Sequence, residues 1–171
     1  MERSLVYSLA LLLSVVSTSP ASASGPYDSS SVHFAQMMIT HHQQAVLISG
    51  WALKQGSNPS VKKFASRIIG EQSPEIAQMK KWIPAGEMMG MGMTMQGLVD
   101  PADLAKLKVA RGKKFDGLYL VDMTLHHQGA ISMATSLLKS SNPEVAALCK
   151  SIVSAQSAEI KEMRRIMITG K

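Results

Sequence analysis

The chain is poor in cysteine, in aromatic residues and in long apolar runs. Cys149 is its only cysteine, so no disulfide can form within the chain, and no C-x-x-C-H motif is present for covalent haem attachment. After Val16 no segment is long and apolar enough to cross a bilayer. Stability must therefore come from packing, from bound metal or from both.

The N-terminus carries an arginine, an apolar run from Leu5 to Val16 and a small-residue end at 21–23. The run is shorter than the roughly 20 residues that span a bilayer, which favours a cleaved secretory signal over an anchor. We predict a signal peptide over residues 1–23 and one domain over 24–171. The expected location is the periplasm, with secretion as an alternative and no integral membrane segment after cleavage.

The net charge of +6 raises the question of nucleic-acid binding. Lysines and arginines are scattered as short pairs, such as Lys62-Lys63 and Arg164-Arg165, and no aromatic residues alternate with them. This pattern indicates solvated helix faces, so no nucleic-acid partner is expected. The charge suits an acidic partner protein or an anionic membrane surface.

An internal repeat organises the sequence. The stretches "MITHHQQA" and "MTLHHQGA" are each followed by "SNP" and then by "EQSPEIAQM" or "AQSAEIKEM". The repeat units cover about 32–83 and 115–168, and a Met-rich linker over 84–114 joins them. The chain thus consists of two copies of one helix-loop-helix unit.

Apolar spacing and caps predict helices over 32–55, 59–83, 115–140 and 143–168. Asn58 with Pro59 and Asn142 with Pro143 are typical helix starts, and the linker tail from Ala102 to Arg111 predicts a short extra helix. Pro74 predicts a kink or break in the second helix. Two short hairpins and one long connection indicate an all-α four-helix bundle.

Four of the five histidines lie in the two M-x-x-H-H motifs. Adjacent helical residues diverge by about 100°, so one histidine of each pair points into the core and the other lies at its flank. Met stands where di-iron bundles have Glu in Glu-x-x-His, and thioether with imidazole selects Cu(I) and, by the same logic, Ag(I). The predicted core ligands are His41, His42, His126, His127, Met37, Met38 and Met123.

Packing is the competing interpretation, because a lone core histidine is more often hydrogen-bonded than metal-bound and methionine usually fills cores. Two matched pairs are harder to explain this way. Glu75 and Glu159 would supply a harder site or face solvent equally well. Met79, Met163 and Cys149 are interpreted as core filler.

The linker stretch "EMMGMGMTM" alternates methionine with other residues, which would project thioethers to one side of an extended chain. We predict a flexible soft-metal clamp there, with a mobile apolar linker as the alternative. Its members are Met88, Met89, Met91, Met93 and Met95. His33 is expected on the surface, where with Met37 it would form an incidental Cu(II) site.

The tandem "MITHHQQA" and "MTLHHQGA", with the following "NP" and Q-x-x-E-I-x-x-M, resemble a bacterial family of exported, ferritin-like bundles catalogued as a domain of unknown function. The resemblance covers nearly all of 24–171. It implies a four-helix ferritin-like fold, a monovalent-copper site at the consecutive histidines, and a role in copper tolerance through binding and delivery.

We therefore expect a periplasmic copper-binding protein or metallochaperone without catalysis, acting in copper resistance and homeostasis. Its expected partners are copper ions and a copper sensor or efflux protein of the envelope. Movement of the first helix would open the site, because its serine-rich start lacks an evident cap. The alternatives are an iron or manganese di-metal oxidase using the four histidines with Glu75 and Glu159, and a non-covalent haem electron carrier.

Overall fold

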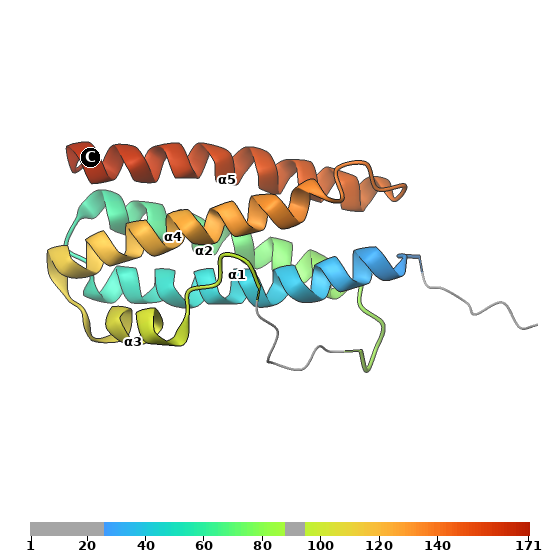
Figure 1. The fold of residues 1–171 in the computed structure, drawn as a ribbon, viewed down its shortest axis with the longest axis horizontal. Coiled ribbons are helices and arrows are strands. Elements are labelled where there is room, and N and C mark those ends of the chain that lie inside the picture. Colours follow the sequence, from blue (N-terminus) through green and yellow to red (C-terminus); the bar gives the residue numbers. More distant parts are fainter. Residues whose placement is uncertain (1–25, 88–94) are drawn as a thin grey trace, which may run out of the picture.

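The computed structural model describes residues 26–87 and 95–171, and within these ranges every regular element is a helix (Figure 1). None of these helices has an apolar stretch long enough to span a membrane. The predicted signal peptide lies in the part that is not described and stays a prediction. The helices are α1 (Ser29–Gln55), α2 (Pro59–Lys80), α3 (Pro101–Val109), α4 (Gly112–Thr135) and α5 (Pro143–Thr169).

The long helices form two hairpins, α1 with α2 and α4 with α5, and the hairpins meet mainly where α1 packs against α4 (Figure 1). By contrast, α2 and α5 make few contacts with each other. The short helix α3 lies in the connection and packs on α4. The predicted four-helix bundle and the extra helix in the linker are confirmed.

The start of α1 differs from its prediction. Asp28 caps the helix, and its side chain accepts a hydrogen bond from the Ser31 backbone nitrogen at 2.7 Å. The interpretation of an uncapped, weak entrance was wrong, because the cap lies one residue before the serine run. Motion of α1 therefore has no support from its N-terminus.

Pro74 does not break α2, which continues from Pro59 to Lys80. The hydroxyl of Ser73 donates to the Ile69 carbonyl at 2.6 Å in the same turn. Helix α4 ends at Thr135, five residues before its predicted end, and turns cover the following residues. Tertiary packing on α1 keeps α2 helical despite the missing proline N–H.

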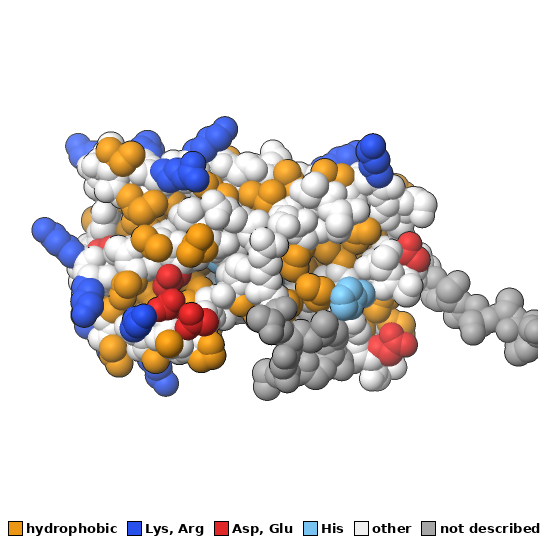
Figure 2. Space-filling model, viewed as in Figure 1, with side chains coloured by type: hydrophobic (Ala, Val, Ile, Leu, Met, Phe, Trp, Pro, Cys, Tyr) orange, Lys and Arg blue, Asp and Glu red, His pale blue; other side chains and the backbone are white. Residues whose placement is uncertain are grey.

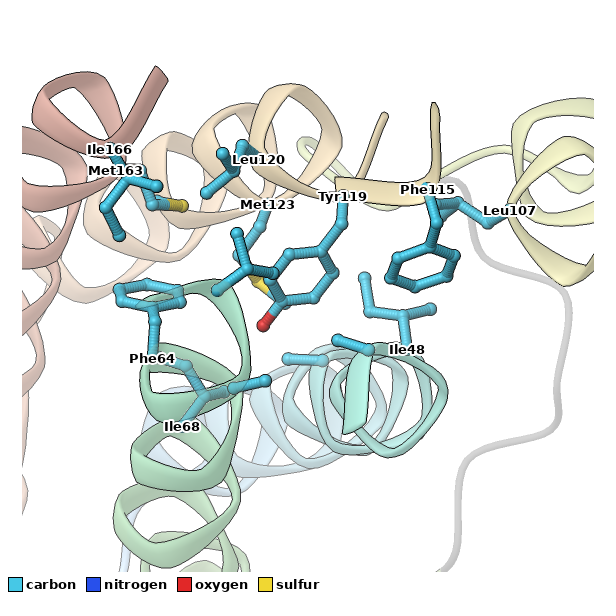
Figure 3. Close-up of a cluster of buried hydrophobic side chains, with 14 of the residues drawn as sticks. Ile48, Phe64, Ile68, Leu107, Phe115, Tyr119, Leu120, Met123, Met163 and Ile166 are labelled. Carbon is cyan, nitrogen blue, oxygen red and sulfur yellow. The ribbon is translucent and has the colours of Figure 1, made fainter. Parts of the chain in front are cut away.

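Two apolar clusters fill the bundle, one toward each end. The Tyr119 cluster contains Phe64, Phe115, Tyr119, Met123 and Met163, with its neighbours drawn in Figure 3. The second, here called the Trp82 cluster, contains Phe34, Met38, Met79, Trp82 and Cys149. Cys149 is fully buried in this cluster, which confirms its interpretation as core filler, and burial raises the pKa of its thiol to about 11.

The C-terminal end of the Met-rich connection is fixed on the bundle. Gly97, with φ of +86°, packs its backbone against Gly129 of α4. On α1 the Gln44 side-chain amide donates to the Val99 carbonyl at 2.9 Å and accepts from the Val99 nitrogen at 2.8 Å. Gln44 and Gly129 occupy the same position in the two repeats. The two copies therefore carry different residues at this position, and both residues contact the connection.

This docking corrects one prediction for the methionine clamp. Met95 is 7% exposed and packed, so it is not part of a free clamp. Met88, Met89, Met91 and Met93 lie outside the described residues. At the other end of the connection, the Glu87 carbonyl accepts from the Gln36 side chain at 2.6 Å. Both described ends of the connection are thus hydrogen-bonded to α1.

We predict that Gly129→Ala destabilises the protein. A Cβ there would lie 2.1 Å from the Gln96 carbonyl oxygen, so the loop must move. Overpacking of this kind costs about 1–3 kcal/mol. Urea unfolding measures the change.

The matched control is Gly117→Ala in the same helix, where nothing lies within 4 Å of the added carbon. It should stabilise by about 0.5–1 kcal/mol through helix propensity. Equal gains from both substitutions would show that the loop does not rest on α4.

Candidate metal centre

A layer of polar side chains separates the two apolar clusters. On α1, His41 and His42 lie between Met38 of the Trp82 cluster and Ala45 of the Tyr119 cluster. Helix α4 passes through the same clusters in the opposite order, with its two histidines again between them. The layer, called the polar layer below, contains His41, His42, Gln72, Glu75, His126, His127, Gln156 and Glu159.

The four histidines come together across the α1–α4 contact, and none is exposed. The rings of His41 and His126 lie with their centroids 3.6 Å apart and are tilted by 38°. The centroids of His126 and His127 are 6.2 Å apart. The motif positions that sequence singled out therefore share one buried layer.

Each hairpin contains one imidazole–carboxylate pair. His42 Nε2 lies 2.8 Å from Glu75 Oε2, and His127 Nε2 lies 3.0 Å from Glu159 Oε2. Sequence reasoning left these glutamates open to a solvent-facing position. Glu159 is instead 5% exposed and Glu75 is half-buried. The pairing needed the register between helices, which sequence alone does not supply.

Within the described residues, the hydrogen bonds leave at least one ring nitrogen free on each imidazole. A carboxylate only accepts, so Nε2 of His42 and of His127 carries the hydrogen, and His126 Nε2 donates likewise to the His41 carbonyl at 3.0 Å. The Nδ1 atoms of these three rings, and both nitrogens of His41, have no hydrogen-bond partner within the described residues. A carboxylate on one ring nitrogen and a free lone pair on the other is the usual arrangement of metal-binding histidines.

Burial keeps the rings of His41, His126 and His127 neutral. It lowers the pKa of His41 to about 3, with the neighbouring His42 and His127 acting in the same direction. Burial also lowers the pKa of His127 to about 3, and that of His126 well below its usual range. Neutral imidazole is the form that binds metal, so protons do not compete for these nitrogens near neutral pH.

Two buried methionines flank each imidazole–carboxylate pair. Met38 lies one helical turn from His42, and Met79 lies one turn from Glu75 in the same direction, because α1 and α2 are antiparallel. Both belong to the Trp82 cluster. Met123 and Met163 repeat this spacing in the other hairpin and belong to the Tyr119 cluster, where Met123 lies beside Tyr119 and Met163 beside Ile166 (Figure 3).

The four methionines are therefore divided between the two apolar clusters, on opposite sides of the polar layer. Sequence reasoning placed Met38 and Met123 together around all four histidines, but they lie in opposite clusters. It also interpreted Met79 and Met163 as core filler, and both are fully buried in the apolar clusters, one turn from Glu75 and Glu159. Met37 is half-buried outside the clusters, and His33 is exposed on the surface as expected.

Hard-metal coordination is not preformed here. Among the residues that the structure describes, no three side chains of His, Cys, Asp or Glu are placed to hold one ion. Glu75 and Glu159 each bond an imidazole, whereas di-iron bundles use such carboxylates as direct ligands. In each hairpin the positions one helical turn from the imidazole and from its carboxylate partner are instead buried methionines.

Comparison with known proteins now places the chain. Residues 31–167 match the model of the family described as Domain of unknown function (DUF305), and the chain belongs to this family. No curated protein matches the sequence.

Solved structures of the same fold are similar to it. CopM in its Cu(II)-bound form is 35% identical with a TM-score of 0.67, covering 79% of this chain and 93% of that one. CopM is also known in Cu(I)-bound and Ag-bound forms, each 34% identical. A DUF305 fragment from Deinococcus radiodurans is 28% identical with a TM-score of 0.74, covering 83% of this chain and 97% of that one.

A DUF305 protein from Streptomyces coelicolor, whose description proposes that it is secreted, is 29% identical with a TM-score of 0.72. The match covers 79% of this chain and 90% of that one. The family resemblance seen in the tandem histidine motifs is thereby confirmed.

We predict that His41 and His127 do not titrate between pH 5 and 7.5 in the folded, metal-free protein. Their folded pKa lies below the unfolded value, so their contribution to stability is complete above pH 6.5 and is lost as the pH falls toward 3. The loss is about 1.4 kcal/mol per pH unit for each ring. The NMR shifts of the ring protons, followed across this pH range, report the protonation of each ring directly.

The same chain unfolded in urea is the control, and there both rings should titrate near 6.5. A midpoint near 6.5 in the folded protein would contradict the buried, neutral state.

Proposed function

We propose that this protein is an exported, non-catalytic carrier that sequesters Cu(I), and also Ag(I), and delivers it in copper resistance and homeostasis. One observation carries the proposal: the Nδ1 atoms of four buried imidazoles have no hydrogen-bond partner among residues 26–87 and 95–171, and they lie in a layer bordered by buried thioethers.

The energetics of the polar layer support a ligand. A buried polar atom without a partner costs about 1–3 kcal/mol, and native cores contain few of them. Several such atoms lie in one layer and recur in both copies of the repeat, so they lower the stability of the metal-free fold. A soft cation would satisfy the nitrogen lone pairs, and neighbouring sulfur atoms select Cu(I) or Ag(I) over hard cations.

The repeat defines two equivalent sites. His42 with Met38 and Met79 would hold one ion, and Glu75 would orient the imidazole through Nε2. The second site would use His127, Met123 and Met163 in the same way, with Glu159 in the role of Glu75. His41 and His126 lie between the two sites and would let an ion pass from one to the other.

The similar structures and the surface support the wider role. CopM is known with Cu(I), Cu(II) and Ag, which are the cargo proposed here. Export to the periplasm fits the signal-like start. Lysine and arginine side chains are spread over both ends of the face in Figure 2, which suits an acidic sensor or efflux partner. The exposed His33 beside Met37 would take Cu(II) only incidentally.

We expect two tight Cu(I) sites in an anaerobic titration against a chromophoric chelator. Changing both Met38 and Met79 to Leu should weaken one site at least about tenfold, roughly 1.4 kcal/mol, because sulfur ligands are lost while volume is conserved. Changing Met123 and Met163 as well should weaken both sites.

Met167→Leu is the matched control, since Met167 is 42% exposed outside the clusters, and its binding should be unchanged. Undiminished Cu(I) binding by the four-methionine variant would overturn the proposed ligand set. Iron or manganese in the purified protein, with oxygen-dependent turnover, would replace the carrier by a di-metal enzyme.

A further inference from the structure

A cleft between α2 and α5 opens onto the polar layer from outside. Its volume is about 350 Å³, and it lies where these two helices make few contacts. The polar groups on its walls are oxygen-rich. They come from Glu71, Gln72, Glu75, Ser151, Gln156 and Glu159.

The cleft concentrates negative charge in a basic protein. Glu71, Glu75 and Glu159 line it, and Arg67 is the cation beside them, with its Nε 3.7 Å from Glu71 and 3.9 Å from Glu159. Arg67 is already bonded to Glu162 at 2.5 Å. Three of the chain's twelve acidic side chains, Glu71, Glu159 and Glu162, thus lie beside one guanidinium. Partial burial and the adjacent Glu159 raise the pKa of Glu71 to about 7, as expected where carboxylates crowd together.

Two buried amides line the same cleft with unused hydrogen-bonding atoms. Gln72 is 2% exposed, and neither Oε1 nor Nε2 has a partner in the described part of the chain. Gln156, its equivalent in the other repeat, is 3% exposed, and its Oε1 has no partner there either. An apolar residue would fill this space at lower cost, so the amides point to a ligand.

We propose that the α2–α5 cleft binds a hydrated divalent cation of the hard, oxygen-preferring class, whose bound waters are held by the carboxylates of Glu71, Glu75 and Glu159 and by the amide oxygens of Gln72 and Gln156. No three acidic or histidine side chains among the described residues are placed to hold an ion directly. The cation therefore keeps several of its waters, as Mg²⁺ and ions of similar size do.

This site differs in chemistry from the copper sites. It offers only oxygen donors, which disfavour Cu(I). It still adjoins them, because Glu75 and Glu159 line the cleft and also bond His42 and His127. The proposal does not require soft-metal binding, so either one can fail alone.

The test is Mn²⁺ binding to the metal-free mature protein, followed by the loss of the free-ion EPR signal. The wild type should bind one Mn²⁺, and so should the four-methionine variant described above. Glu71→Gln should weaken binding by about tenfold, since an anionic ligand becomes neutral. Gln72→Met, similar in shape but without an amide oxygen, should weaken Mn²⁺ binding while the metal-free protein melts at the same or a higher temperature.

Asp103→Asn is the control, because Asp103 lines a different acidic hollow, between α3 and α4, and should leave binding unchanged. The proposal is overturned if the wild type leaves the Mn²⁺ signal intact, or if Glu71→Gln and Gln72→Met bind as the wild type does. Loss of binding in Asp103→Asn alone would move the cation to that other hollow.

Discussion

The interruption of the apolar core by a polar layer is the constraint on which the rest of this structure depends. Each long helix contributes two polar side chains at mid-length, and the apolar clusters on either side seal the layer from water at both ends. Polar groups in such a place must find partners. The imidazole–carboxylate pairs satisfy one ring nitrogen of His42 and one of His127, and the ring nitrogens without a partner among the described residues give the layer its chemistry.

Differences between the two repeats show what each copy does besides supporting this layer. Gln44 forms hydrogen bonds to the connection through its side-chain amide, whereas Gly129, which has no side chain, allows the backbone of the same connection to pack closely against α4. Cys149 stands where the other copy has Ala65, and both are buried. The positions that meet the layer itself, such as Gln72 and Gln156, are identical. The layer is thus common to both hairpins, while the loop contacts are not.

Sequence predicted the helices and the buried histidines, because three- and four-residue spacing reports which residues share a helical face. It could not predict that Met38 and Met123 lie in opposite clusters, since spacing within a helix carries no information on the register between helices. For the same reason, the contact between His42 and Glu75 could not be predicted from the sequence. Met95 was misjudged because its burial depends on a glycine 34 positions away, Gly129, that admits the loop.

The close contact between the His41 and His126 rings has a consequence in terms of symmetry. These two residues are equivalent in the repeat, and their rings lie with centroids 3.6 Å apart, so the pseudo-two-fold axis relating the hairpins passes between them. In an isologous interface only a residue near the axis meets its own copy. The single chain therefore has the organisation of a hairpin dimer joined by a linker, and a substitution at His41 changes one half of a self-complementary contact.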